Sequence, residues 1–153
     1  MIYVECLPDR TLVKVLGVPK RKIEHAGDKG RICNRLEKTY NSKGLIDEDP
    51  FSLQPNYIKR LKLISAEDEI KFLYDEKTKN HLIILSPRLE GWILKAAKEA
   101  EVDIKRHGLP DEEHELHKVI NMRLKEFENF LEEIRKNSNM LKTLEGFIKV
   151  KDR

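Results

Sequence analysis

Acidic residues gather at two places where apolar segments of the chain end. Glu5 follows an apolar stretch at residues 2–4, and the run Asp-Glu-Asp at residues 47–49 follows a second apolar stretch. Aspartate and glutamate have a low preference for strands, and like charges at close range repel each other. Mg²⁺ prefers oxygen ligands, keeps several waters and leaves coordination positions for phosphate oxygens. If the two places meet in the fold, the residues suit metal-assisted chemistry on a phosphate.

The elements that must position these residues alternate between strand and helix patterns. They are, in order, a strand at 2–5, a helix capped by Asp9 and ended by Gly17, a strand at 23–26, a helix with its apolar face at Ile32, Cys33, Leu36 and Tyr40 and its end at 41–44, and a strand at 45–49. The connections are short and each helix is long enough to cross back over a sheet. This order predicts an α/β fold with parallel strands.

The carboxyl ends of adjacent parallel strands meet at one edge of a sheet, and ligands bind along that edge. Side chains alternate along a strand, so Asp47 and Asp49 are expected on one face and Glu48 on the other. If the first and third strands are neighbours, Glu5 joins Asp47 and Asp49. Three carboxylates in one place then need a proton or a cation.

This arrangement resembles the Toprim family, the metal-dependent domain of topoisomerases, bacterial primases and certain nucleases. The family has a Glu-Gly-x-x-Asp motif after its first strand, and the segment from Glu5 to Asp9 has the same spacing. It has an Asp-x-Asp motif at the end of its third strand, which Asp47 and Asp49 match. The resemblance covers about the first fifty residues well and the segment to about residue 100 loosely. Cys6 stands where the family commonly has glycine.

The resemblance implies a Toprim-like α/β fold, with a mostly parallel sheet flanked by helices, a hairpin and a long C-terminal helix. It implies a nuclease or related phosphoryl-transfer protein that depends on Mg²⁺ or Mn²⁺ and acts on DNA or RNA, closest in size to the small nuclease branch. Glu5 would be the general acid or base, and Asp47 and Asp49 the metal ligands. The alternative is a non-catalytic Toprim-fold module that binds nucleic acid or a protein, which Cys6 and the small size favour. A phosphatase-like hydrolase with Asp47 as nucleophile usually places its Asp-x-Asp at the first strand, which disfavours it here.

Further residues are candidates for the same site, and each also has an ordinary structural role. Lys29, in the Gly-Asp-Lys-Gly turn at 27–30, could present its charge to a phosphate or lie in solvent. Arg88 could meet a phosphate, and Glu90 could join the acidic group or favour a helix N-terminus. His25 lines the site or ends a strand, and Asp9 is functional or a helix cap.

The remaining chain is expected to form a loop at 50–55, a helix or extended segment at 57–64, a hairpin over 70–85 and a helix from Pro87 to Ala100. A long helix is expected where apolar residues recur from Leu116 to Ile134. We therefore expect a Toprim-like domain at 1–110 and a helical extension at 111–153 packed on it. The extension could also support a homo-oligomer or a protein partner.

Composition and charge bound the class of protein. The 153 residues are 37% charged, and the longest apolar run, at 82–85, is too short to cross a membrane. The first residues lack the pattern of a signal peptide, and two cysteines do not make a disulfide framework, so we expect a cytoplasmic protein. One glutamine among 57 charged residues is typical of thermophile proteins.

Charge is uneven along the chain. Residues 1–62 carry a net charge of +5, whereas residues 63–153 carry -2. A basic half around a small acidic group suits an anionic partner, such as nucleic acid, that meets carboxylates through a cation. Ordinary scatter of surface charge accounts for this excess equally well.

Overall fold

The structure is a computed structural model and describes residues 1–151. Six strands form one mixed sheet in the order β2-β1-β3-β6-β5-β4. Strands β2, β1, β3 and β6 are parallel to one another, and β5 pairs antiparallel with both β6 and β4. The strands are β1 (Ile2–Val4), β2 (Ile23–His25), β3 (Lys43–Asp47), β4 (Lys62–Glu67), β5 (Ile70–Asp75) and β6 (Asn80–Leu85). The α/β class and the hairpin over 70–85 are confirmed.

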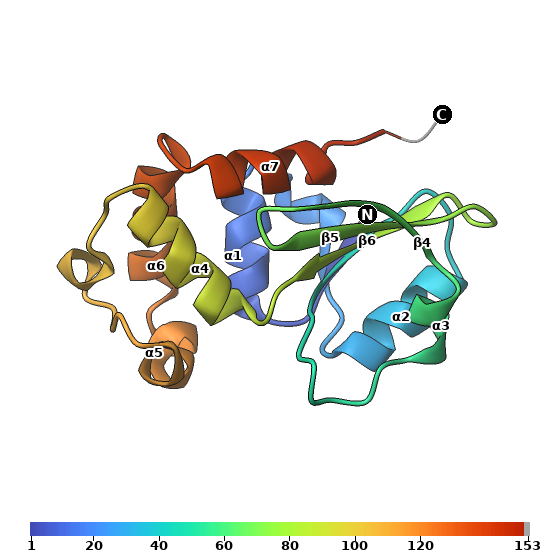
Figure 1. The fold of residues 1–153 in the computed structure, drawn as a ribbon, viewed down its shortest axis with the longest axis horizontal. Helices are drawn as coiled ribbons and strands as arrows, with labels where there is room; N and C mark the ends of the chain where they lie inside the picture. Colours follow the sequence, from blue (N-terminus) through green and yellow to red (C-terminus); the bar gives the residue numbers. More distant parts are fainter. Residues whose placement is uncertain (152–153) are drawn as a thin grey trace.

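Helices cover both faces of this sheet (Figure 1). They are α1 (Leu7–Val15), α2 (Lys29–Glu37), α3 (Asn56–Lys59), α4 (Leu89–Glu99), α5 (Glu113–Val119), α6 (Leu124–Arg135) and α7 (Asn139–Ile148), with short 3₁₀ turns η1 (Lys20–Lys22), η2 (Ile104–His107) and η3 (Ile120–Met122). Within residues 1–151, none of these helices has the length and apolar character needed to cross a membrane.

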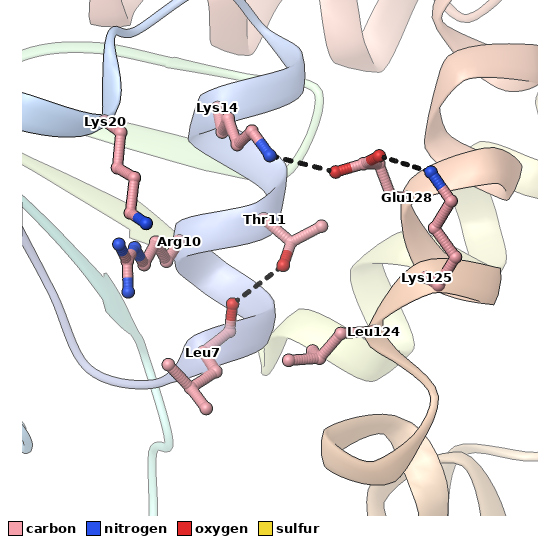
Figure 2. Close-up of a pocket in the computed structure, with 8 residues that line it drawn as sticks. All are labelled: Leu7, Arg10, Thr11, Lys14, Lys20, Leu124, Lys125 and Glu128. Carbon is pink, nitrogen blue, oxygen red and sulfur yellow. Dashed lines mark hydrogen bonds and ion pairs between the residues drawn. The ribbon is translucent and has the colours of Figure 1, made fainter.

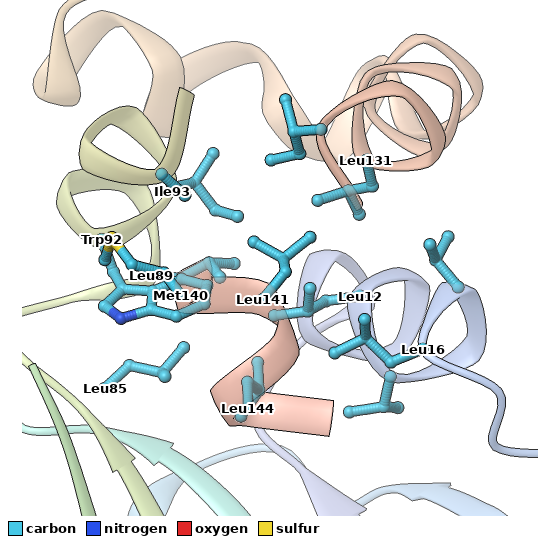
Figure 3. Packing of buried hydrophobic residues seen from close by; sticks show 14 of the residues in the cluster. Leu12, Leu16, Leu85, Leu89, Trp92, Ile93, Leu131, Met140, Leu141 and Leu144 are labelled. Atoms are coloured by element: carbon cyan, nitrogen blue, oxygen red, sulfur yellow. The ribbon is translucent and has the colours of Figure 1, made fainter. Parts of the chain in front are cut away.

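The larger core lies between one face of the sheet and helices α1, α4, α6 and α7. Alternation along β1 sends Ile2 and Val4 to this face and Tyr3 to the other. Figure 3 shows side chains from four separate helices packed in this core, with Trp92 at one side: Leu12 of α1 and Leu16 just after it, Ile93 of α4, Leu131 of α6, and Leu141 and Leu144 of α7. The core therefore joins residues on both sides of position 110.

The smaller core lies under α2 and α3, where Gly44 of β3 lets α2 approach the sheet. A Cβ at Gly44 would lie 2.8 Å from Ile32 Cγ2 and 3.1 Å from Leu36 Cδ1, both in buried side chains. Only a residue without a side chain fits this contact.

Replacing Gly44 with alanine is expected to lower the free energy of unfolding by about 1–3 kcal/mol, because the buried side chains around it must shift. Chemical denaturation measures the loss. The control is Gly146→Ala, since Gly146 lies in α7 with open space around its Cα and alanine favours a helix. Equal stability of the two variants would show that α2 does not pack as closely as the structure indicates.

Several expected boundaries are wrong. Cys6 is the N-cap of α1 and Asp9 lies inside its first turn, so Asp9 is not a helix cap. Helix α2 ends at Glu37, which leaves Tyr40 outside the helix and 70% exposed. The third strand begins at Lys43, inside the segment expected to end the helix, and stops at Asp47 instead of residue 49. The polar residues at these turns suit a helix end, a loop or a strand start equally well, so the sequence did not indicate the exact boundaries.

The expected long helix from Leu116 to Ile134 is also wrong. The chain forms α5, the turn η3 and α6, with a break at Arg123, whose backbone (φ -130°, ψ 43°) is not helical. Leu116, Ile120 and Phe127 are all buried, because each segment turns its apolar face to the same core. A regular spacing of apolar residues along the sequence can thus arise from separate helices that pack on the same core. The segment at 57–64 divides between α3 and β4, whose exposed edge position leaves no apolar alternation.

Candidate functional site

Two acidic residues meet at the carboxyl edge of the parallel strands. Strands β1 and β3 are hydrogen-bonded parallel neighbours with Val4 opposite Leu45, so Glu5 and Asp47 emerge at the same edge. An open pocket of about 330 Å³, called the acidic pocket here, lies at this edge. Its lining residues are Glu5, Gly27, Asp28, Lys29, Gly30, Asp47, Asp49, Ser52 and Leu53. The expected neighbouring strands are confirmed, and Glu5, Asp47 and Asp49 line the same pocket.

Burial and mutual repulsion alter the protonation of this group. Burial, followed by the charge of Asp47, raises the pKa of Glu5 from 4.5 to about 7. Burial, followed by the charge of Glu90, raises the pKa of Asp47 from 3.8 to about 7. Both carboxyl groups therefore change charge near neutral pH, and a cation would favour their charged forms.

Asp9 is a further member of the acidic group. Its residue surface is 1% exposed, and neither carboxylate oxygen has a hydrogen-bond partner among residues 1–151. Burial, then the charges of Asp47 and Glu5, raise its pKa well above the usual range. A buried carboxyl group is costly without good hydrogen bonds. The neighbouring Cys6 thiol, a weak donor, acts the other way and lowers the pKa of Asp9.

Glu90 reaches the same group from the first turn of α4. It is 6% exposed, and its charge raises the pKa of both Asp47 and Asp9. Its Oε1 lies 2.9 Å from Nδ1 of His117, whose side chain is 71% exposed. No pattern in the sequence indicates this contact, because 27 positions separate the two residues.

Asp49 joins the site by a different route from the one expected. Strand β3 has ended two residues earlier, and Asp49 has a positive φ of 42° while its N–H donates to Pro87 O. A turn, rather than strand alternation, therefore brings Asp49 near Asp47. Its Oδ1 accepts a hydrogen bond from Arg88 Nη2 at 2.9 Å. Asp47 Oδ1 accepts one from the N–H of Leu89 at 3.0 Å, at the start of α4.

Lys29 holds the loop beside the pocket. Its Nζ donates to Glu48 O at 2.8 Å, to Gln54 Oε1 at 3.1 Å and to Ser52 Oγ at 3.2 Å. Of the two roles expected for Lys29, the solvated one is thus wrong, and direct contact of Lys29 with a phosphate would require these bonds to break. His25 Nε2 lies 3.1 Å from the backbone oxygen of Glu5, so it borders the site without lining the pocket.

The cysteines contribute no evident nucleophile. Both are free; Cys33 is buried and Cys6 half-buried. Burial, followed by the charge of Asp9, raises the pKa of the Cys6 thiol far above its usual range. A thiol that keeps its proton is a poor nucleophile and a poor metal ligand.

A divalent metal at this site would need oxygen ligands from the carboxylates that line the acidic pocket. Within residues 1–151 no group of three or more histidine, cysteine, aspartate or glutamate side chains is arranged to hold a metal ion by itself. Mg²⁺ is usually bound through one or two carboxylates, with waters and substrate phosphates completing its shell. The carboxylate oxygens of the acidic pocket, and the unpartnered Asp9 beside them, fit this second kind of site.

The identity of the site rests on this geometry. Comparisons with protein-family models, with curated proteins and with solved structures find no match to this chain.

Proposed function

We propose that the chain is a Toprim-like, Mg²⁺- or Mn²⁺-dependent protein that hydrolyses phosphodiester bonds in nucleic acid. The observation that carries this proposal is the meeting of Glu5 and Asp47 at the ends of adjacent parallel strands, with the pKa of each raised to about 7. Such carboxyl groups exchange protons at neutral pH, and their charged forms attract a cation. The spacing from Glu5 to Asp9 and from Asp47 to Asp49 supports the same assignment.

The roles follow from position. Asp47 and Asp49 would hold the metal, which when bound acts as a Lewis acid on the phosphoryl group. Glu5 would transfer the proton, since its pKa is raised to about 7 and the best catalytic pKa lies near the working pH. Leu89 N–H fixes one oxygen of Asp47, and Arg88 fixes one oxygen of Asp49. These contacts hold the two carboxylates in place before any ligand binds.

A second candidate, a non-catalytic module that binds nucleic acid, has one observation in its favour. Arg88 neutralises Asp49 without any metal, through the contact at 2.9 Å. In that case the acidic group would be a structural feature, and the protein would bind without cleaving.

A cleavage assay separates the two candidates. We expect end-labelled DNA or RNA oligonucleotides to be cut in the presence of 5 mM Mg²⁺ or Mn²⁺, and to stay intact in EDTA, because carboxylates alone cannot stabilise a phosphoryl transition state. Gel electrophoresis of single-stranded and duplex substrates measures the products. Binding without cleavage under every metal condition would support the module and contradict the enzyme.

A further inference from the structure

A second pocket lies beside α1, and its basic side chains outnumber the acidic side chain that could pair with them. The pocket measures about 320 Å³ and is called the basic pocket here. Its lining residues come from α1, from η1 and from α6: Leu7, Arg10, Thr11, Lys14, Lys20, Leu124, Lys125 and Glu128 (Figure 2). From these residues we infer that the basic pocket binds backbone phosphates of the nucleic acid whose scissile bond lies in the acidic pocket; the identity of the ligand rests on the proposed function.

The charge of the pocket is strongly positive. Glu128 is its single acidic lining residue, and it contacts both Lys14 and Lys125 at 3.3 Å. These lysines lower the pKa of Glu128, so it stays charged, yet it balances only one of four cations. The lining therefore keeps a net charge of +3, which favours an anion.

Arg10 and Lys20 supply the charge that is not compensated. Among residues 1–151, no hydrogen bond or ion pair involves either side chain. Figure 2 shows both side chains on the same side of α1, and both line the pocket although ten positions separate them in the chain. Two neighbouring cations repel each other unless an anion lies between them, and the guanidinium fork suits phosphate oxygens.

The location of the pocket connects it with the acidic pocket. Glu5 lies just before α1, and Arg10 lies in the second turn of the same helix. Lys14 follows one turn later, about 6 Å further along the helix axis. Arg10 and Lys14 thus lie one turn apart on α1, with Lys20 of η1 and Lys125 of α6 lining the same pocket. Four cations spread over three elements suit several phosphates of a chain better than a single small anion. The excess of +5 in residues 1–62 is partly gathered here.

Salt dependence of binding tests this inference without catalysis. Fluorescence anisotropy would measure the affinity for a fluorescein-labelled 20-nucleotide single-stranded DNA in EDTA, from 25 to 200 mM KCl. The slope of log K against log[KCl] is about -0.7 for each phosphate contact on a single strand. We expect Arg10→Ala/Lys20→Ala to make the slope less negative by about 1.4 and to weaken binding at 50 mM KCl by at least about 10-fold. The matched control is Lys98→Ala/Lys142→Ala, which removes the same charge from exposed positions on α4 and α7.

Equal slopes for the two double variants would overturn the inference, as would failure of the wild type to bind at 25 mM KCl. The cleavage assay tests the proposed function separately. Metal-dependent cleavage together with unchanged salt slopes would support the proposed function of the acidic pocket and contradict only the inference about the basic pocket. If the double variant unfolds, Lys20→Ala alone should change the slope by about 0.7, because Lys20 is exposed at the start of η1. An unchanged slope in Lys20→Ala would contradict the inference equally.

Discussion

Replacing Glu5 with glutamine is expected to lower the rate of metal-dependent cleavage by about 10²–10⁴-fold, the usual contribution of a positioned general acid or base. Glutamine keeps the size of the side chain but cannot exchange a proton. The pKa of Glu5 is about 7 without metal, and a bound cation lowers it, so the wild-type rate should change with pH at or below neutrality. In the variant this limb of the pH profile should disappear, and a merely structural role for Glu5 would not produce that change.

The matched control for Glu5→Gln is Glu132→Gln, an exposed change on α6 outside the acidic pocket. It should leave both the rate and the pH profile unchanged. Initial rates on the labelled substrate, measured from pH 5.5 to 8.5 at saturating metal, give the comparison. A Glu5→Gln variant within about three-fold of the wild type, with the limb still present, would assign the proton transfer to another group.

The part of the site that the sequence predicted depends on strand order alone. Glu5 and Asp47 each follow a short buried strand, and parallel strands bring their ends to one edge whatever the details of the loops. The β-α-β-α-β order was readable because its strands are apolar and its turns contain glycine. Element boundaries were less accurate, since a cap such as Cys6 forms no side-chain bond and leaves no pattern in the sequence.

The contacts that the sequence did not reveal all join distant segments. His117 reaches Glu90 from α5, and Lys29 reaches the loop at 48–54 through three hydrogen bonds. Asp9 matches a family motif, but its complete burial without partners follows from the packing of α1 on the sheet. The broken helix between Leu116 and Ile134 has the same origin, because periodicity records which side faces the core and not where the chain turns.

The metal-free protein is expected to lose stability as pH rises from 5 to 8. Folding raises the pKa of Glu5 from 4.5 to about 7 and that of Asp47 from 3.8 to about 7. Between these values the folded state holds protons that the unfolded state has released, so the free energy of unfolding falls as pH rises through this window. Glu5 and Asp47 each hold a proton over about two pH units above pH 5, so their total loss should be on the order of 5 kcal/mol, or a fall of roughly 10–20 °C in Tm. Asp9, whose pKa is raised well above its usual range, adds to the fall. Carboxylates with lowered pKa values, such as Glu145, act below their ordinary range and add little in this window.

Mg²⁺ should partly reverse this loss at pH 8, because a cation stabilises the charged carboxylates that destabilise the metal-free fold. At ten times its dissociation constant, the ion would add roughly 1.4 kcal/mol to the free energy of unfolding by mass action.

In Asp47→Asn the amide oxygen can still accept the N–H of Leu89, so the fold should persist while the pH dependence of Tm and the effect of Mg²⁺ on Tm both shrink. Asp111→Asn, at an exposed residue paired only with Lys105 at 3.6 Å, should behave as the wild type. Thermal melts from pH 5 to 8, with and without Mg²⁺, measure these changes. A Tm that rises with pH and does not change with Mg²⁺ would contradict the prediction. It would mean that ion pairs such as Asp49–Arg88, and no cation, compensate the charge of the acidic group.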